Sequence, residues 1–213
     1  MNVSLDTLDR ATFVRIAGED RLGQVLDGIG SARAAGIGPI KINTVLMRGY
    51  NDGEILDLVS YAAERGMEIR FIEWMPTAGQ IYSAREDRYL SVPAAREIIT
   101  NHCTLVPDDE PGSSSPARSY RVEGSASRIG FITPLSNAFC GSCNRVRVKA
   151  DGMFKTCLHG REDLNFRELL RSGASDGTIG GLVAEAVFGR PKEHFLNDAS
   201  VPHNDFVMTA VGG

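Results

Sequence analysis

The order of apolar and polar positions in the first third of the chain predicts a repeat of strands and helices. Short runs rich in β-branched and apolar residues begin near Asn2, Ile40 and Glu68. Each of the first two runs is followed by a pattern of helical periodicity. This order suits parallel strands with crossover helices, in a barrel or in an open α/β sheet.

Two helices are predicted between these strands. The first covers residues 21–35 and ends at Gly36, a residue suited to a left-handed cap. Its apolar side chains recur at helical spacing, at Leu22, Val25, Leu26 and Ile29. The second begins at Asp52 as its N-cap and stops at Gly66. Its apolar side chains are Ile55, Leu56, Val59 and Ala63.

The composition of the chain changes after this repeat. One short helix is predicted in "VPAAREIITNHC", and the Pro, Ser and acidic content of "PDDEPGSSSPARS" predicts a mobile loop. Beyond it, "SYRVE", "SRIGFIT" and two arms around residues 150–152 are typical of antiparallel strands, and helices follow near residues 165–188. We therefore divide the chain into residues 1–76, 77–118 and 119–213, the last being an α+β region.

Composition and charge limit the classes of function that fit the chain. The chain has 213 residues and a formal net charge of −4. This charge argues against nucleic acid or an anionic membrane surface as the main partner, because either favours a basic excess. The first residues lack the features of a secretory signal, and no run of eighteen apolar residues occurs, so we expect a soluble cytoplasmic protein that binds no membrane.

Three of the four cysteines lie within "FCGSCNRVRVKADGMFKTC", residues 139–157. Their spacing is C-x2-C-x13-C, from Cys140 through Cys143 to Cys157. Such bunching in a chain of this length favours metal or redox chemistry in a reducing compartment over a disulfide framework. A hairpin that turns at residues 150–152 would bring Cys157 back toward Cys143, although thirteen residues separate them in the sequence.

The register of this hairpin decides which side chains share a face with Cys157. If the loop has three residues, with Gly152 in the left-handed position, Lys149 pairs with Met153. Cys157 then lies opposite Arg145, on the face shared with Arg147 and Lys149. A loop of two residues would turn Cys157 to the apolar face. We predict the three-residue loop, because it unites thiolates and cations in one pocket.

Two kinds of metal site are compatible with three cysteines. A structural zinc site needs a fourth ligand, which Cys103, His102 or His159 could supply. A [4Fe-4S] cluster held by three thiolates instead keeps one iron open for a substrate atom. The neighbouring guanidinium groups favour a substrate with phosphates, since they match phosphate oxygens bidentately. A nucleotide offers both a donor atom and phosphates.

These motifs carry a resemblance. The stretches "NVSLDTLD", "IKINTVLMRGYND", "EIRFIEWMP", "GFITPLSNAFC" and "FCGSCNRVRVKADGMFKTCL" and the terminal Gly212-Gly213 resemble the molybdenum cofactor biosynthesis protein A family. Its members are GTP 3′,8-cyclases, lyases of the radical S-adenosylmethionine superfamily. The resemblance implies conversion of GTP to (8S)-3′,8-cyclo-7,8-dihydroguanosine 5′-triphosphate in molybdopterin synthesis. It covers essentially the whole chain.

The resemblance also implies roles for individual residues. Cys140, Cys143 and Cys157 would hold a [4Fe-4S] cluster whose open iron binds the guanine of GTP. The triphosphate would be held by Arg145 and Arg147, and Lys41 and Arg70 would line the substrate cavity. Ser4 would lie near S-adenosylmethionine. The tail of Gly212 and Gly213 would reach into the site for the radical step.

The chain departs from the family in one large respect. The family's N-terminal CxxxCxxC, whose cluster cleaves S-adenosylmethionine, has no counterpart here, since Cys103 is the remaining cysteine. The resemblance therefore implies a truncated chain that begins at the fourth barrel strand and does not generate the radical alone. The expected fold is the C-terminal half of an incomplete (β/α) radical-SAM barrel, followed by an α+β cluster-binding region. A half barrel would expose Val3, Leu5, Ile40 and Ile42.

Partners follow from the same resemblance. We expect GTP as substrate, a homodimer in the full-length family, a downstream cyclic pyranopterin monophosphate synthase, and no nucleic acid. S-adenosyl-L-methionine and a second [4Fe-4S] cluster belong to the complete enzyme. The alternatives are a zinc- or Fe-S-stabilised nucleotide-binding module without catalysis, and a nonfunctional truncated product.

Overall fold

The structure is a computed structural model that describes residues 1–75, 85–108, 115–196, 198 and 208. These residues divide into two compact units. The first comprises Met1–Met75 with the described residues from Arg85 to Asn137. The second contains the described residues from Ala138 onward.

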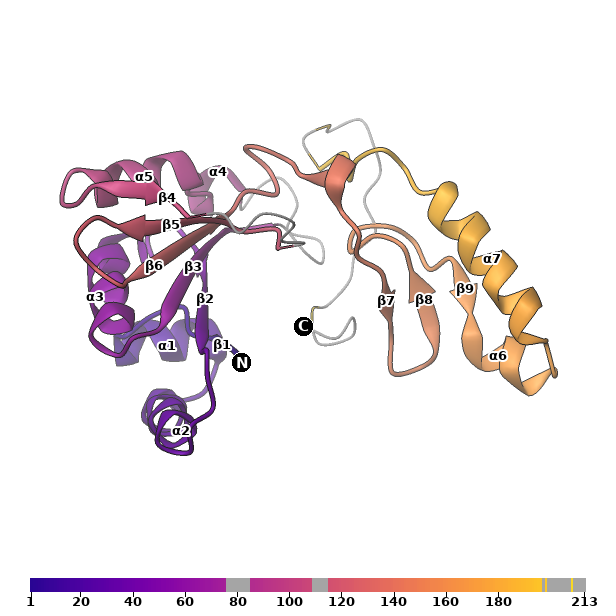
Figure 1. Ribbon diagram of the computed structural model, residues 1–213, viewed down its shortest axis with the longest axis horizontal. Helices are drawn as coiled ribbons and strands as arrows, with labels where there is room; N and C mark the ends of the chain where they lie inside the picture. Colours follow the sequence, from indigo (N-terminus) through magenta and orange to yellow (C-terminus); the bar gives the residue numbers. More distant parts are fainter. Residues whose placement is uncertain (76–84, 109–114, 197, 199–207, 209–213) are drawn as a thin grey trace. The chain divides into compact units, whose positions relative to one another are not determined.

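The strands of the first unit form one sheet in the order β1-β2-β3-β6-β5-β4 (Figure 1). The strands β1, β2, β3 and β6 are parallel neighbours, and β5 and β4 continue the sheet antiparallel. Their bounds are β1 Asn2–Ser4, β2 Lys41–Leu46, β3 Glu68–Glu73, β4 Leu105–Pro107, β5 Arg118–Val122 and β6 Arg128–Ile132. The structure confirms a mixed α/β fold and the parallel repeat expected from the sequence.

The position of β6 differs from expectation. The sequence suggested that this strand stays with the cysteine region, yet it pairs with β3 and aligns Phe71 with Phe131. Both rings are buried and stacked, with centroids 6.2 Å apart, so the pairing extends the apolar core. Residues 119–137 thus belong to the first compact unit. The functional division into 1–76, 77–118 and 119–213 stays a prediction.

The helices of this unit are α1 Arg10–Ala17, α2 Leu22–Ala34, α3 Ile55–Glu64, α4 Arg85–Arg88 and α5 Val92–Thr100. The predicted ends at Gly36 and Gly66 are confirmed, since both residues adopt positive φ angles, of 75° and 63°. The predicted cap at Asp52 is wrong. Its carboxylate accepts from the Gly49 N–H at 2.9 Å, and Asp52 begins the short 3-10 turn η1 Asp52–Glu54 that precedes α3.

The helix α1 was not expected from the sequence. Asp9 caps it, because its Oδ1 accepts from the Thr12 N–H at 2.7 Å. An aspartate three residues before a backbone donor is a usual start signal, and "DRATFVRIA" carries it. The apolar periodicity of this helix is weak evidence by itself, because the helix has only eight residues.

The two faces of the parallel strands differ in character. Alternate residues of β2 and β3 are buried, and these pack in one core with apolar residues of α2, α3 and α5. Leu5, Ile40 and Ile42 are at most 4% exposed, so the expectation that they are bare is wrong. All three side chains belong to the apolar core, together with residues of the helices of the same unit. The opposite face of β2 and β3 is mainly polar and carries Lys41, Asn43, Glu68 and Arg70 beside Val45 and Ile72.

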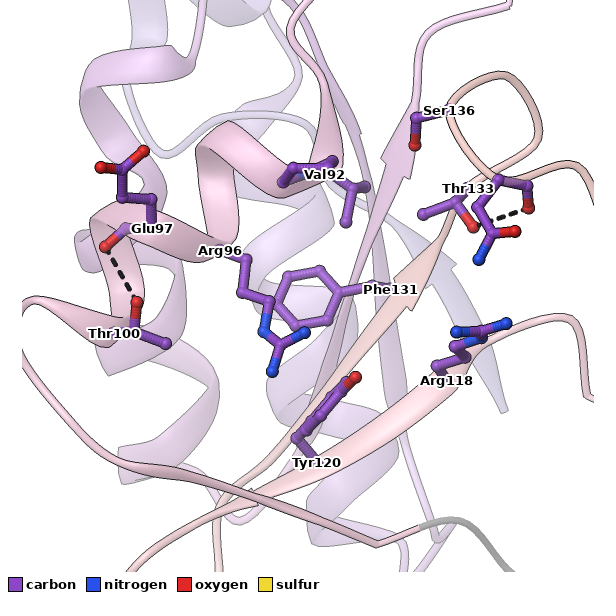
Figure 2. A pocket seen from close by; sticks show the side chains of 11 residues that line it. Val92, Arg96, Glu97, Thr100, Arg118, Tyr120, Phe131, Thr133 and Ser136 are labelled. Carbon is purple, nitrogen blue, oxygen red and sulfur yellow. Dashed lines mark hydrogen bonds between the residues drawn. The ribbon is translucent and has the colours of Figure 1, made fainter.

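A pocket of about 500 Å³ lies where α5 approaches β5 and β6 (Figure 2). Its lining includes apolar, aromatic and cationic side chains, among them Val92, Arg96, Arg118, Tyr120 and Phe131. It lies on the helix side of the sheet, because Tyr120 and Phe131 belong to the core cluster or pack against it.

The second unit contains a small antiparallel sheet in the order β7-β8-β9. Its elements are η2 Cys140–Ser142, β7 Arg147–Val148, β8 Met153–Lys155, β9 Leu164–Asn165, α6 Phe166–Arg171 and α7 Asp176–Phe188. The hairpin and the helices near residues 165–188 confirm the prediction. Phe154 of β8 is buried and stacks on Phe166 of α6, with ring centroids 5.1 Å apart, which joins the sheet to the helix.

Within the described residues, no helix combines the length and the hydropathy that a membrane span requires.

Candidate functional site

The first two cysteines of the site lie in one tight turn. Cys140 begins η2, and the Cys143 N–H donates to the Cys140 carbonyl at 3.2 Å. Arg190, just beyond α7, donates from its guanidinium to the Cys143 carbonyl at 2.8 Å. The cysteine turn is therefore held by its own backbone and by the chain after α7.

The hairpin has the predicted register. Arg147 aligns with Lys155, and the Lys149 N–H donates to the Met153 carbonyl at 2.8 Å. The Gly152 N–H donates to the Lys149 carbonyl at 2.9 Å, and Gly152 has a φ of 85°. A three-residue loop is confirmed. The ladder ends at Arg147 and Lys155, so the placement of Cys157 opposite Arg145 stays a prediction.

Cys157 is fixed by residues that the sequence reasoning missed. The preceding Thr156 donates from its N–H and its hydroxyl to one carboxylate oxygen of Asp163, at 2.7 and 2.9 Å. The Gly160 N–H donates to the Cys157 carbonyl at 3.2 Å. A side chain at Gly160 would place its Cβ 3.2 Å from the Cys157 Cβ, so the glycine permits this close return of the chain.

Of the three thiols, Cys140 has a shifted pKa. Burial raises the pKa of Cys140, a hydrogen bond from the His194 backbone opposes this, and the neighbouring Cys157 and Cys143 raise the pKa further. The three cysteines are half-buried and none forms a disulfide.

The sulfur donors fit an iron–sulfur cluster in their chemistry. Cysteine thiolates are the usual ligands of such clusters, and each thiolate binds a different iron. Charges on Cys157 and Cys143 contribute to the raised pKa of Cys140. In the part of the chain that the structure describes, no three His, Cys, Asp or Glu side chains gather closely enough to hold a metal ion.

The other predicted ligands are divided between the two units, since His102 and Cys103 belong to the first and His159 to the second. Cys103 belongs to the first unit, where burial raises its pKa and its thiol donates to the Ile99 carbonyl at 3.5 Å. His102 contacts the Ile98 carbonyl through Nδ1 at 2.9 Å. His159 is buried in the second unit, its ring centroid 6.2 Å from that of His194. Of these three, His159 shares the unit of the cysteine trio.

The cations of the hairpin differ in their surroundings. Lys149 pairs with Glu162 at 2.5 Å and Asp151 at 2.9 Å, and these carboxylates raise its pKa. Arg145 is exposed, and Arg147 is half-buried. The expectation that Lys149 joins the two arginines as a substrate cation is not supported, because its charge is already compensated.

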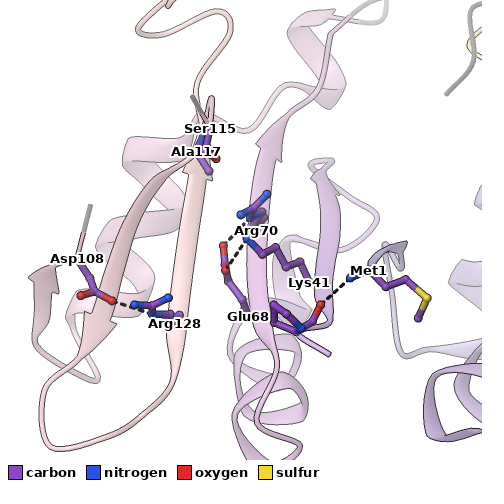
Figure 3. A network of polar contacts seen from close by, with 9 residues as sticks. Met1, Lys41, Glu68, Arg70, Asp108, Ser115, Ala117 and Arg128 are labelled. Atoms are coloured by element: carbon purple, nitrogen blue, oxygen red, sulfur yellow. Dashed lines mark hydrogen bonds and ion pairs between the residues drawn. The ribbon is translucent and has the colours of Figure 1, made fainter. Parts of the chain in front are cut away.

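Two further predicted residues meet on the polar face of the first unit (Figure 3). Arg70 donates from Nε to Glu68 Oε1 at 2.5 Å, and the Lys41 Nζ lies 3.6 Å from Glu68 Oε2. A Cβ on neighbouring Gly130 would lie 3.0 Å from the Arg70 Cγ, so the glycine leaves room for Arg70. Sequence reasoning found both cations but missed the carboxylate between them.

Ser4 ends β1 on this same polar face. It aligns with Asn43 of β2, which aligns in turn with Arg70 of β3. Ser4 is exposed, and the Asn43 Oδ1 is a buried acceptor without a hydrogen-bond partner in the described chain. The predicted residues Gly212 and Gly213 lie outside the described residues.

Comparison with known proteins shows the family of the chain. Residues 67–196, more than half of the chain, match the family described as Molybdenum Cofactor Synthesis C. The chain belongs to this family. The match includes β3, the cysteine trio, Arg145 and Arg147, and the segment after α7.

Individual relatives carry a consistent name. The chain is 38% identical over 213 residues to a GTP 3′,8-cyclase of Mycobacterium sp. (strain KMS), covering all of this chain and 61% of the relative. It is 40% identical to that of Ectopseudomonas mendocina (strain ymp), covering all of this chain and 64% of the relative. It is 43% identical to that of Erythrobacter litoralis (strain HTCC2594), covering 91% of this chain and 58% of the relative. The chain thus spans less than two thirds of these curated relatives.

Proposed function

We propose that this chain is the substrate-positioning part of a GTP 3′,8-cyclase, a lyase of molybdenum cofactor synthesis. The observation that carries the proposal is the hairpin register, which pairs Arg147 with Lys155 and Lys149 with Met153. Continued along both arms, this register would set Cys157 opposite Arg145. The family match and the names of the relatives support the same function.

Cys140, Cys143 and Cys157 would hold a [4Fe-4S] cluster through their thiolates. Such a cluster, when bound, supplies an open iron that accepts a donor atom of the guanine base. Arg190 and Asp163 would act on the ligands indirectly, since they fix the backbone at Cys143 and before Cys157. The half-buried position of the thiols limits access of water.

Arg145 and Arg147 would bind the triphosphate of GTP. A guanidinium matches two phosphate oxygens, and Arg145 is exposed without an ion pair in the described chain. The family resemblance assigns Lys41 and Arg70 to GTP binding as well, and in the first unit both cations pair with Glu68. These residues would hold the reacting atoms of GTP in place and neutralise the negative charge of its triphosphate.

The radical step of the proposed reaction needs further parts of the enzyme. We propose that β1, β2, β3 and β6 are part of a radical-SAM barrel, with Ser4 near S-adenosyl-L-methionine and the Gly212-Gly213 tail acting in the radical step. The printed sequence holds no CxxxCxxC for the second [4Fe-4S] cluster. We therefore expect no catalytic turnover by this polypeptide alone.

The assembly and the cellular setting belong to the same proposal. The family resemblance supports a homodimer, and a cyclic pyranopterin monophosphate synthase would consume the product. Three thiols without a disulfide suit the reducing cytoplasm. Light scattering on the purified protein tests the dimer.

Anaerobic reconstitution with iron and sulfide tests the central claim. We expect about four irons and four sulfides per chain, and a sharp loss of both in Cys157→Ala. Cys103→Ala is the matched control, because Cys103 lies in the first unit, and it should keep the full iron content. Full iron in Cys157→Ala would contradict the proposal. Zinc without sulfide in the wild type would favour the zinc-stabilised nucleotide-binding module.

A further inference from the structure

The pocket between α5 and the strands β5 and β6 has no role in the function proposed above. None of the cysteines, Arg145, Arg147, Lys41, Arg70 or Ser4 lines it. All of its lining residues belong to the first unit and are described by the structure. Its volume of about 500 Å³ lies within the range of small-molecule sites.

A buried carboxylate holds two walls of this pocket together. Glu73 is 1% exposed and accepts from the Val92 N–H at 3.1 Å, at the start of α5. Its other oxygen accepts from the N–H groups of Leu135 and Ser136, both at 2.9 Å. The helix and the loop after β6 are thus tied to one acceptor. A pocket with fixed walls is preformed, so a ligand need not order them.

The pocket presents two guanidinium groups (Figure 2). The Arg96 guanidinium lies 4.6 Å from the centroid of the Tyr120 ring, which holds the cation against the wall. Arg118 projects from β5 and is exposed. Within the described chain neither makes an ion pair or hydrogen bond through its guanidinium. Glu97 supplies one carboxylate to the lining, so positive charge remains in excess.

Aromatic and polar groups complete the lining. Phe131 is buried at the floor, and Tyr120 meets it edge-on with ring centroids 5.6 Å apart. Ser136 and Asn137 lie on the loop after β6 and are exposed. The loop is closed by the Thr133 hydroxyl, which donates to the Asn137 carbonyl at 3.1 Å. An aromatic wall beside uncompensated cations suits a ligand with a flat ring and an anionic group.

We propose that this pocket binds a small heteroaromatic phosphate of the size of a nucleoside monophosphate. The phosphate would lie between Arg96 and Arg118, where two guanidinium groups can each present a pair of donors. The flat ring would lie against the half-buried Tyr120, above the buried Phe131. The inference does not depend on the cysteine site or on GTP binding there.

Calorimetric titration with AMP tests this site. The protein carries Arg145→Ala and Arg147→Ala as a background, so that the proposed triphosphate site does not contribute. We expect AMP to bind, and binding to weaken about tenfold or more in Arg118→Ala, because a charged hydrogen bond to phosphate is lost. Arg96→Gln should weaken it similarly. Adenosine and inorganic phosphate should each bind at least about tenfold more weakly than AMP, since each lacks one half of the recognised chemistry.

Arg121→Ala is the matched control. Arg121 lies on the same strand but outside the pocket, with its guanidinium 3.8 Å from Asp108. AMP affinity should be unchanged in this variant. Absence of AMP binding, equal affinity in Arg118→Ala, or equal affinity for adenosine would each overturn the proposal. Thermal melts of all variants establish that they are folded, and unchanged iron content shows that the cysteine site is unaffected.

Discussion

Arg70 and Lys41 converge on a single carboxylate, with Glu68 accepting from Arg70 at 2.5 Å and lying 3.6 Å from the Lys41 Nζ. The Arg70 and Glu68 side chains are only 12% and 9% exposed, so solvent screens this contact weakly. Glu68 therefore holds both cations in position. It also cancels one of the two positive charges that an anionic substrate would meet.

Glu68→Gln is expected to strengthen GTP binding. The amide keeps an acceptor for Arg70 but removes a negative charge that repels the triphosphate, and we expect about a tenfold gain in affinity. Calorimetry on the cluster-reconstituted protein measures it, and the gain should shrink at high salt. Glu64→Gln serves as the control, because Glu64 is 71% exposed and pairs with Arg65. Weaker binding in Glu68→Gln would mean that positioning of the cations outweighs charge.

Arg145→Ala and Lys149→Ala are expected to differ although both residues lie on the hairpin. Arg145 is exposed, and its loss should weaken GTP binding by about tenfold or more, since a charged contact to phosphate disappears. Lys149 already pairs with Glu162 and Asp151, so its removal should leave GTP affinity within about twofold. Titration of both variants at one ionic strength compares them. Equal losses would show that Lys149 reaches the substrate.

Gly152→Ala is expected to destabilise the second unit. Gly152 has a φ of 85°, and a Cβ there would lie 2.9 Å from the Arg167 Cβ. Strain of this kind costs about 1–3 kcal/mol, which thermal unfolding measures. In Gly180→Ala, by contrast, a Cβ meets nothing within 4 Å in the middle of α7, and helix propensity should stabilise by up to about 1 kcal/mol. Equal melting of the two variants would argue against the described loop.

Asp6→Asn is expected to remove a pH dependence of stability. Burial raises the pKa of Asp6, and the hydrogen bond from the Val45 N–H opposes this only in part. Because the folded state holds this proton more tightly than the unfolded state, the contribution of Asp6 to the free energy of unfolding increases as the pH falls through the folded pKa. Asparagine keeps the acceptor without the charge. The variant should therefore be more stable than wild type at pH 8, with the difference lost toward pH 4.

Chemical denaturation across this pH range measures the effect. Asp27→Asn, an exposed position on α2, provides a control for the loss of one negative charge. A difference between Asp6→Asn and wild type that does not change with pH would contradict the assignment.

Local chemistry explains why the hairpin could be predicted from the sequence. Gly152 is the residue in "KADGM" that best tolerates a left-handed conformation, and this one preference sets the pairing of every residue on both arms. The helices ending at Gly36 and Gly66 were predictable for the same reason. Each depends on residues close together in the sequence.

The failures involve partners that are distant in the sequence. Lys149 was expected to face substrate, but Glu162 reaches it from beyond β8. Glu68 is two residues from Arg70, yet its role depends on Lys41 from another strand. The contacts of Arg190 with Cys143 and of the His194 backbone with Cys140 depend on how the chain returns after α7. Periodicity and spacing carry no signal for such tertiary contacts.

The three-residue turn at Ala150, Asp151 and Gly152 limits how the number of residues between Cys143 and Cys157 can change. Continued along both arms, this register would set Cys157 opposite Arg145. A single residue inserted into either arm would break that pairing, whereas one residue added to each arm would keep it. Natural variation of the interval between Cys143 and Cys157 should therefore occur in steps of two wherever the hairpin is retained. The geometry of a pleated ribbon thus limits which insertions and deletions evolution can accept at this site.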